Sequence, residues 1–563
     1  MRTVPALATR LDRALPAALA LVVALPALLT AATMAGSGWR PVGLDMALEL
    51  LRTWEVGSRH TPLVGAYSRY GWDHPGPLLF IVSAPAVRLL GPTGLLVTAG
   101  VVNALAAAGT VLAAHRIGGL RLALPAAVAT GLMTHALTAA GITDPWNPYV
   151  AVLPFLAYLV CVWGAVNGDR VLLVAAVVAG SWCVQAHLGY LPITLAAAGL
   201  GGGLRLAWRR SRGLAAMPWP WVAAALTVGV LLWLPPVIDQ FTSAHGNLGD
   251  LVAFARDGTN PAELEARPVG WSPALDAMRG MVTPPAPWTT PVGPDQYLEV
   301  PSGTATASTV VVVGLVAVGG LAWWRGRRRP AVLVGLSVVL VGLSVVAMAR
   351  ASDDLYGYLI RWSWGVAALA WTAGAWAVVE LVGRREPGRR PVPPVLPVLA
   401  AAAVLAIALL GVRTVSDGST HRVTHDPAVA AVTDVSRQLR TELDPDVTYE
   451  LVADSNWHYL VAPGIAVDLI THGQRLVVSP GLAPTFKTWR TADPDRAYAQ
   501  VVLLPTVKVP AWRLQHPDAR RLATHVPRTR AERAEPVTGV PHEAWLVPRP
   551  PEPPSPPGPA AGI

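Results

Sequence analysis

Residues 15–32 read LPAALALVVALPALLTAA, a run that contains no charged side chain. A helix needs about 20 such residues to cross the hydrocarbon core of a bilayer. Comparable runs recur along the chain, among them TVVVVGLVAVGGLAWW at residues 309–324. The sequence therefore predicts a mainly α fold, a polytopic membrane helix bundle of about 11 spans. We expect these spans near residues 15–35, 95–114, 122–141, 149–166, 171–186, 188–204, 219–236, 308–324, 331–349, 360–382 and 394–413.

The basic residues indicate which loops face the cytoplasm. The formal net charge is +9, but the arginines gather at the ends of apolar runs, as at 209–210, 327–329 and 384–385. Basic loops stay on the inner side of a membrane, which explains this pattern better than a nucleic-acid partner. The N-terminus is then cytoplasmic and the C-terminus extracytoplasmic. Heavy use of Ala, Gly, Pro and Arg, with only Lys487 and Lys508 as lysines, is typical of high-GC bacterial genomes, so we expect a bacterial plasma membrane protein.

One apolar run does not fit as a span. Counting residues 78–92 as a crossing would put the later arginine clusters outside, so we expect this run to lie along the outer surface as a juxtamembrane helix. The transmembrane domain is then 1–413, with outer loops 36–94 and 237–307. The two cysteines both lie in apolar runs, which predicts neither a disulfide framework nor a thiolate metal site.

The C-terminal part of the chain has a more ordinary composition. Residues 414–546 include strand-like segments such as TYELVA and QVVLLP, separated by a helical segment. They predict a small extracytoplasmic α/β domain. The final stretch, 547–563, is rich in proline and predicts a disordered tail.

An amphipathic helix is expected directly after the first span. In GLDMALELLRTWEVG, at residues 43–57, Asp45, Glu49 and Arg52 fall on one helical face beside a stripe of leucines. Asp45 is explained equally well as a helix cap or as a functional acid. Glu49 and Arg52 are explained more simply as a solvated ion pair.

The stretch GWDHPGPLLF, at residues 71–80, places an acid and an imidazole before an apolar helix. Asp73 could cap that helix, with Pro75 in its first turn and His74 incidental. The alternative is that an acid and a basic group at the entrance to lipid serve a phosphate held near the headgroups and an acceptor that must lose a proton. The residue types alone leave both explanations open.

Two further motifs join neighbouring spans on the outer side. In TDPWNPY, at residues 143–149, the prolines and Asn147 are first of all turn residues. Asp144 and Trp146 could also line a sugar site, with Asn147 as a further substrate-binding candidate, although a turn alone explains the motif more simply. In QAHLGY, Gln185 and His187 stand where two spans meet with almost no loop. Polar side chains at membrane depth are costly without a role or a partner, which favours a function for this pair.

Two more polar motifs lie at span ends. In VIDQF, Asp239 and Gln240 either cap the end of a span or contribute to substrate binding. In RASDDLYGYLIRW, Arg361 is either neutralised by the neighbouring aspartates or part of a phosphate clamp.

This layout resembles the GT-C type glycosyltransferases that use polyprenyl-phosphate sugars, the protein-mannosyltransferase-like and aminoarabinose-transferase-like group. Members carry an acid in the first outer loop, then a short acid-basic-proline element that opens a juxtamembrane helix, many spans and often an outer C-terminal domain. Asp45 matches the first acid, and Asp73 and His74 match the acid and the base before the prolines of HPGPL. Two departures are that His74 stands where lysine is common and that Gly76 interrupts the proline pair.

The resemblance implies a hexosyl- or pentosyltransferase that moves a sugar from a polyprenyl-phosphate donor to a cell-envelope glycan, lipid or protein. Asp45 would be the general base, and Asp73 would orient the acceptor or hold a divalent ion. His74, Arg361 and either Arg59 or Arg69 would stabilise the departing phosphate. No cofactor is implied with certainty, and the need for a divalent metal ion stays open.

The main alternative is a membrane protein without catalysis, such as a transporter or flippase for envelope lipids. That class is expected to carry charged residues near the bilayer midplane and inverted repeats. Here the polar motifs lie at the outer rim and the sequence shows no such repeat. A third hypothesis is a GT-C fold that serves as an assembly partner for envelope lipids or polysaccharide.

Overall fold

The computed structural model describes residues 4–243, 246–292, 296–383, 395–424, 426–453, 457–479, 483–493, 495–534 and 537–548. The chain divides into two units, which are described separately. Unit 1 comprises residues 1–38 and 55–423, and unit 2 comprises residues 39–54 and 424–563. The tail expected at 547–563 lies outside the described residues, apart from its first two positions.

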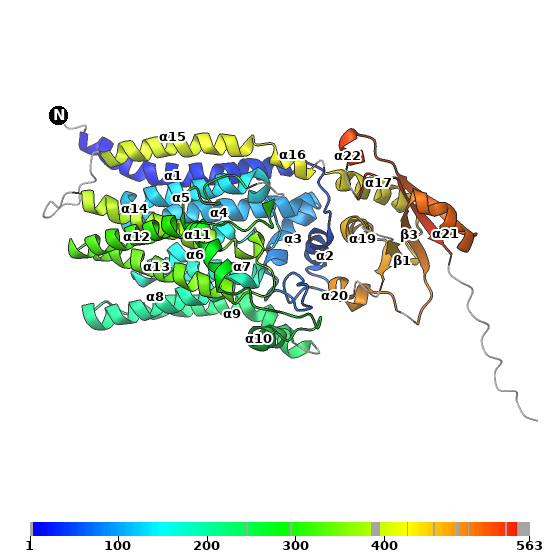
Figure 1. Ribbon diagram of the computed structural model, residues 1–563, viewed down its shortest axis with the longest axis horizontal. Helices are drawn as coiled ribbons and strands as arrows, with labels where there is room; N and C mark the ends of the chain where they lie inside the picture. The colour runs from blue at the N-terminus through cyan, green and yellow to red at the C-terminus, as the bar shows by residue number, and fades with distance from the viewer. Residues whose placement is uncertain are drawn as a thin grey trace, which may run out of the picture. The chain divides into compact units, whose positions relative to one another are not determined.

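Unit 1 is a bundle whose long helices run alongside one another (Figure 1). Helix α15 lies against α1, and α14 packs against α12 and α13. The helices of this unit are α1 (Val4–Met34), α3 (Leu78–Leu90), α4 (Thr93–Gly118), α5 (Leu120–Ile142), α6 (Val152–Val166), α7 (Arg170–Ala186), α8 (Leu191–Arg212), α9 (Trp219–Thr242), α10 (Asn247–Asp257), α11 (Trp271–Val282), α12 (Ala305–Trp324), α13 (Arg328–Ala349), α14 (Ser363–Val382), α15 (Val395–Val415) and α16 (Ser419–Thr424). Two short 3-10 helices are η1 (Leu188–Tyr190) and η3 (Gly357–Ile360).

Each of the expected spans overlaps one of these helices. In the described part of the chain, 8 helices are long and apolar enough to cross a membrane: Ala14–Met34, Thr93–Gly118, Leu120–Ile142, Trp219–Thr242, Ala305–Trp324, Arg328–Ala349, Ser363–Val382 and Val395–Thr424. Helices α6 and α7 are apolar but shorter, and α8 ends in an arginine-rich turn. The number of spans therefore stays a prediction. Helix α3 has 13 residues, about 20 Å of helix, which is too short to cross the hydrocarbon core.

Ion pairs join several loops at one end of the bundle. Asp169 caps α7 by accepting two backbone N–H groups and lies 2.8 Å from Arg116. The carboxylate of Glu380 lies 3.0 Å from Arg121 and 3.8 Å from Arg327. The loops that follow α4, α6, α12 and α14 therefore share this end. Helices α5, α7 and α13 each begin at this end and run away from it, so the loops that follow them lie away from the ion pairs.

Unit 2 is built on a five-stranded sheet with the order β2-β1-β3-β5-β4. Strand β1 is parallel to β2 and β3, whereas β5 is antiparallel to β3 and β4. Helix α17 packs against β4, and α19 packs against β1 and β2. The bounds are α17 (Pro427–Glu442), β1 (Thr448–Ala453), α18 (Trp457–Leu460), α19 (Ala462–Thr471), β2 (Arg475–Val478), α20 (Ala483–Phe486), β3 (Ala499–Pro505), α21 (Val509–Gln515), β4 (Arg520–His525), α22 (Arg530–Ala534) and β5 (His542–Val547).

The amphipathic helix of the first outer loop belongs to unit 2. This helix is α2 (Leu44–Glu55). The backbone N–H of Gly43 donates to Leu460 O at 2.8 Å just before the helix begins. Near its end, the guanidinium of Arg52 lies over the ring of Trp489, 5.3 Å from the centroid. Residues separated by most of the sequence thus fold together in this unit.

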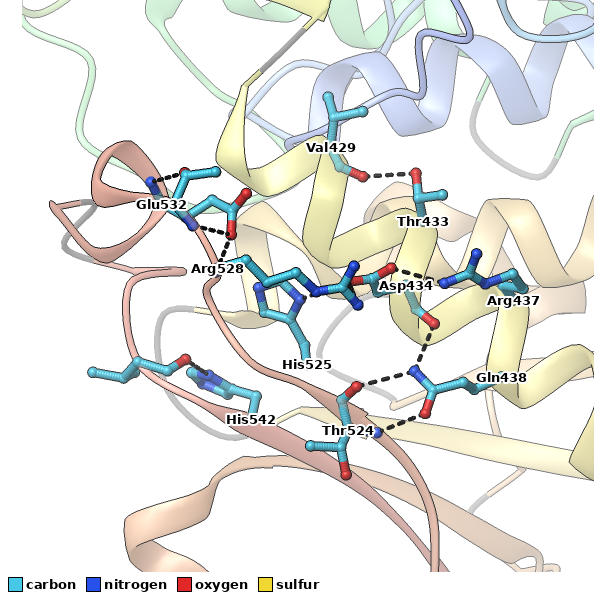
Figure 2. A network of polar contacts seen from close by, with 12 residues as sticks. Val429, Thr433, Asp434, Arg437, Gln438, Thr524, His525, Arg528, Glu532 and His542 are labelled. Atoms are coloured by element: carbon cyan, nitrogen blue, oxygen red, sulfur yellow. Dashed lines mark hydrogen bonds and ion pairs between the residues drawn. The ribbon is translucent and has the colours of Figure 1, made fainter.

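A buried histidine links strand β4 to helix α17 in unit 2. Figure 2 shows His525 beside Asp434, and the two side chains are 3.4 Å apart. His525 pairs with His542 in the sheet register, and His542 stacks on Trp457 with ring centroids 3.8 Å apart. Burial lowers the pKa of His525, although the Asp434 carboxylate opposes that shift. The folded unit therefore holds this ring neutral where an unfolded chain would protonate it.

We expect unit 2 to lose stability as the pH falls below the ordinary histidine pKa of 6.5. The unfolded chain then binds a proton that folded His525 does not, so acid favours unfolding. His525→Asn should flatten this dependence, whereas His516→Asn should leave it unchanged. Urea unfolding of the full-length protein, followed by protease susceptibility of unit 2 from pH 7.5 to 5.5, measures it. An identical pH slope in the parent and in His525→Asn would show that another group is responsible.

Candidate functional site

Residues 65–74 form a backbone hairpin ahead of α3. Gly65 N–H donates to His74 O at 2.8 Å, and Asp73 forms an antiparallel bridge with the opposite arm. The turn lies at Gly71, whose φ of 85° favours glycine. Helix α3 begins after the hairpin, and no side chain caps it. Asp73 is therefore a hairpin residue and not the helix cap considered from the sequence.

Two glycines bring this hairpin against the end of α7. A β-carbon at Gly76 would lie 2.1 Å from Oε1 of Gln185, and one at Gly65 would lie 2.8 Å from Gly76 O. Gln185 is fully buried, and its Nε2 donates to Leu232 O of α9 at 2.8 Å. No residue larger than glycine fits at position 76 without movement. The glycine that interrupts the proline pair of the motif thus has a steric cause.

The two histidines of the sequence motifs lie side by side. The ring centroids of His74 and His187 are 4.6 Å apart, and both side chains are buried. Leu188 N–H donates to Nδ1 of His74 at 3.1 Å, and Gly189 N–H donates to Nδ1 of His187 at 3.1 Å. Burial lowers the pKa of His187 to about 4, and burial beside His187 holds the pKa of His74 well below its usual range. Both rings are neutral at pH 7.

Asp73 is held through its main chain by the first residue of α10. Asn247 Oδ1 accepts from Asp73 N–H at 2.8 Å, and Asn247 Nδ2 donates to Asp73 O at 2.9 Å. Asp239 in turn accepts from Asn247 N–H at 3.1 Å, and Gln240 accepts from Gly249 N–H at 2.9 Å. Asp239 and Gln240 therefore hold the first turn of α10, whereas the sequence suggested that they cap the end of the preceding span. The carboxylate of Asp73 itself is buried.

An aromatic cluster lies over the loop between α5 and α6. Trp146 stacks on Tyr149 with centroids 5.6 Å apart and packs against Tyr358 at 4.9 Å and Tyr297 at 5.9 Å. Tyr358 N–H donates to Tyr297 O at 2.8 Å, which joins the long outer loop to the segment before α14. Trp146 thus lies among three tyrosine rings. This position is compatible both with stacking on a sugar and with a packing role within the loop.

Arg361 is a buried cation at the edge of this cluster. Its exposed fraction is 4%, and its Nη2 donates to the Tyr149 hydroxyl at 2.8 Å. The guanidinium also lies over the rings of Tyr149 and Trp364, at 5.0 and 4.6 Å. In the described part of the chain it forms no ion pair, and its Nε has no hydrogen-bond partner. A buried charge without a counter-ion costs stability, so the site is suited to an anion that is not part of the chain.

Short contacts link the aromatic cluster to the histidines. Asn147 Nδ2 donates to Ala186 O at 3.0 Å, and the Tyr190 hydroxyl donates to Pro148 O at 2.9 Å. Tyr190 also lies edge-on to His187, with centroids 6.3 Å apart. The hairpin, the start of α8 and the loop between α5 and α6 therefore form one continuous polar region, which we call the rim site.

Asp144 is a rim-site residue that the sequence presented mainly as part of a turn. Its Oδ1 accepts from Trp146 N–H at 2.9 Å, which is the turn geometry expected from the motif. Burial raises the pKa of the Asp144 carboxyl to about 6, with the Trp146 N–H opposing the shift. A carboxyl with such a pKa can exchange protons near neutral pH, which is the property that a general base needs.

The remaining predicted cations lie in different surroundings. Arg69 lies 2.9 Å from Asp353, which also accepts from the Tyr70 hydroxyl. Burial and this hydrogen bond raise the pKa of Tyr70 to about 12. Arg59 is exposed and donates to the neighbouring His60 at 3.0 Å. Of the arginines named from the sequence, Arg361 is therefore the one buried without a carboxylate partner in the described chain.

Asp45 lies in the first turn of α2 and is exposed to solvent. Glu49, on the same helix face, is buried instead, as is Arg52. The sequence pattern predicted the helix and the shared face but assigned the two later residues to solvent. Among the residues that the structure describes, no three His, Cys, Asp or Glu side chains are grouped as ligands for a metal ion.

An apolar groove of about 520 Å³ lies between α6, α7, α8 and α9. At one end it is lined by Val184, Thr194 and Trp233, and at the other by Val166 and Arg205. Trp233 Nε1 donates to the hydroxyl of a serine on α7 at 3.0 Å, which holds α9 against the groove. Val184, at the first of these ends, directly precedes Gln185, so this end of the groove lies at the same level of α7 as the rim site.

Gly76→Ala should destabilise unit 1 by about 1–3 kcal/mol, because the added methyl group meets Gln185 in a packed site. Gln185→Ala, made in the same chain, should recover part of the loss. Thermal unfolding of the parent, both single variants and the double variant measures the coupling between the two positions. Strictly additive effects would contradict the close approach. Gly36→Ala is the control, because Gly36 is exposed and a β-carbon there would meet nothing within 4 Å.

Comparison with known proteins finds solved structures with a similar fold but no relative by sequence. No protein-family model matches the chain, and no curated protein matches it. The crystal structure of ArnT from Cupriavidus metallidurans bound to undecaprenyl phosphate matches with a TM-score of 0.53 and 14% identity, covering 94% of this chain and 97% of that chain. The apo structure of the same protein matches with a TM-score of 0.52, the same identity and the same coverage. The chain thus has the fold of ArnT, which confirms the expected GT-C type fold: a mainly α membrane helix bundle with a small C-terminal α/β region.

Proposed function

We propose that this protein is an integral membrane glycosyltransferase that moves a sugar from a polyprenyl-phosphate donor to a cell-envelope acceptor on the extracytoplasmic face. The observation that carries the proposal is that one end of the apolar groove, at Val184, lies at the end of α7 that also carries Gln185 and His187 of the rim site. A lipid-linked sugar needs an apolar channel for its chain and polar groups for its phosphate within a few ångströms of each other. The fold shared with ArnT, which was crystallised with undecaprenyl phosphate, supports the same class of donor.

The groove suits an isoprenoid chain because its walls are apolar and its outer end meets buried hydrogen-bonding groups. Val184 lines the groove, and Gln185 and His187 follow it within three residues at the end of α7. A donor lying in the groove would therefore bring its phosphate to the level of the hairpin. Cavities of a few hundred cubic ångströms are the usual size of sites for small ligands or ligand segments.

Arg361 is the residue that we assign to the phosphate. Its charge is permanent, its fork of donors matches phosphate oxygens, and one amino group is already held by Tyr149. An uncompensated cation in a buried site stabilises negative charge that develops on a leaving phosphate. Trp146, beside it, offers an aromatic face for the sugar ring. Arg69 is held by Asp353 and would act only if that pair opened.

The reaction is a single displacement with a proton transfer. The acceptor hydroxyl gives its proton to the carboxylate of Asp45 while its oxygen forms a bond to the anomeric carbon. The bond from that carbon to the phosphate oxygen breaks, and the lipid phosphate leaves with the electron pair, so the configuration inverts. Asp45 is exposed, so the proton can pass on to water. Asp73 would orient the acceptor. Asp144, whose carboxyl pKa burial raises to about 6, is a second candidate for the proton acceptor.

The proposed orientation puts the N-terminus in the cytoplasm and the C-terminus outside the plasma membrane. It assigns residues 1–413 to the transmembrane domain and 414–546 to the extracytoplasmic domain. The ion pairs at one end of the bundle support it, because they gather the arginine loops that basic-inside topology assigns to the cytoplasm. The rim site then faces outward. A flippase is less well supported, since the buried cation lies at the end of the bundle and not at mid-height.

Arg361→Met should weaken binding of undecaprenyl phosphate at least about tenfold while leaving the protein as stable as the parent or more stable. Removing an unpaired buried charge relieves a desolvation cost, whereas removing a phosphate contact costs affinity. Arg267→Met, at an exposed arginine of the outer loop, is the matched control. Thermal unfolding and lipid binding of the purified proteins measure both effects. Unchanged binding together with lower stability would assign Arg361 a structural role only.

Asp45→Asn should lower the rate of sugar transfer by about 10²–10⁴-fold without loss of lipid binding, because it keeps the shape of the side chain but removes the base. The assay measures transfer from a polyprenyl-phosphate sugar in membranes that contain each variant. Asp257→Asn, at an exposed acid of the outer loop, should transfer like the parent. Full activity in Asp45→Asn with loss in Asp144→Asn would move the base to Asp144. If the parent protein transfers sugar from no polyprenyl-phosphate donor, the proposed glycosyltransferase activity is wrong.

A further inference from the structure

The hydrogen bonds of His74 and His187 determine where each ring carries its proton. Leu188 N–H points at Nδ1 of His74, and Gly189 N–H points at Nδ1 of His187. A backbone N–H can only donate, so Nδ1 must present its lone pair in both rings. A neutral imidazole with an unprotonated Nδ1 carries its proton on Nε2. Both rings are therefore held as the same tautomer by the main chain of a single turn.

This arrangement disfavours two common roles of histidine. An imidazolium would place a proton on Nδ1 facing the backbone N–H, which would break the anchoring hydrogen bond. A metal ligand through Nε2 would need its lone pair there and a proton on Nδ1, because metal-bound histidines donate their other N–H to an acceptor. With both Nδ1 atoms occupied as acceptors, each ring offers one donor, its Nε2–H. Among the described residues, the hydrogen bonds of the two rings are those at Nδ1, and neither Nε2 takes part in one.

The surroundings hold the rings without offering them a counter-charge. Trp72 packs edge-on to His74 with centroids 5.4 Å apart, and the Tyr190 phenol lies beside His187. The Asp73 carboxyl directly precedes His74 in the hairpin. The Asp239 carboxylate, which Asn247 links to the hairpin backbone, accepts from Asn247 N–H and a serine hydroxyl. A β-carbon at Gly189 would lie 2.9 Å from Nδ1 of His187, so this turn also depends on a glycine.

We propose that the Nε2–H groups of His74 and His187 form an uncharged, two-donor subsite for the phosphate of the lipid donor. This inference rests on the proposed function and names the chemistry of one part of it. His187 follows Val184, which lines the groove, by three residues at the end of α7, so a lipid phosphate that left this end of the groove would reach the level of the two rings. Neutral N–H donors bind phosphate oxygens as backbone amides do, without attracting a tightly held counter-ion. His74, which stands where lysine is common in the resembling family, thus offers an uncharged donor at that position.

The matched test uses asparagine at each position. His74→Asn and His187→Asn keep an acceptor near the position of Nδ1 for the backbone N–H but remove the Nε2 donor. Binding of undecaprenyl phosphate to the purified full-length protein in detergent micelles should weaken about tenfold in each variant, the loss expected for one hydrogen bond to a charged group. Thermal unfolding should stay close to that of the parent. His516→Asn, in unit 2, should bind like the parent.

A second measurement reads the tautomer directly. In the protein labelled with ¹⁵N-histidine, both rings should show a protonated Nε2 and an unprotonated Nδ1 at pH 7.5 and at pH 6.5. Undecaprenyl phosphate should shift the Nε2 signals, and inorganic phosphate at the same concentration should shift them less if the groove holds the lipid chain. A doubly protonated ring at pH 7.5 would overturn the inference. So would parental binding in both asparagine variants, whereas a parent that binds no undecaprenyl phosphate would contradict the proposed function itself.

Discussion

Gly76 and Gln185 approach so closely that no β-carbon fits between them. That contact places the hairpin against the end of α7. Gly65, in the hairpin, packs its backbone against Gly76 O. Because the hairpin is seated there, His74 reaches the backbone N–H of Leu188. The same turn of chain positions His187 by its own N–H bond. A steric condition at one glycine therefore decides whether two histidines from distant parts of the sequence meet.

In the rim site, the positive charge and the neutral hydrogen-bond donors belong to different residues. Its one buried cation with no described carboxylate partner is Arg361, and its histidines are neutral donors. A second cation at His74 would add repulsion between two buried charges and would lose the Leu188 anchor. The arrangement limits the desolvation cost of an empty site to a single guanidinium that is partly stabilised by aromatic rings. An arriving phosphate meets donors already oriented, so little reorganisation opposes its binding.

The sequence predicted the membrane helices well because their signal is local. An apolar run such as 15–32 must satisfy its own backbone hydrogen bonds in lipid, and a helix does so without any distant partner. For the site, the sequence predicted which residues take part but not which of them contact one another. TDPWNPY and QAHLGY were recognised as polar motifs at span ends, yet the contact of Tyr190 with Pro148 O depends on how α6 and α8 pack. The protonation of Asp144 depends on burial by several loops, which no spacing pattern encodes.

Helix α2 shows why a local pattern predicts an element but not its partners. The spacing of Asp45, Glu49 and Arg52 predicted an amphipathic helix, and the structure contains it, yet two of the three polar residues are buried. Its apolar stripe would suit any apolar surface, so no local pattern favours packing against residues more than four hundred positions away. Specific contacts determine the partner instead. Gly43 N–H donates to Leu460 O, and the guanidinium of Arg52 lies over the ring of Trp489. Burying Arg52 against an aromatic ring keeps its charge compensated while its carbon chain packs, so a helix that looks solvated in sequence is anchored in the structure.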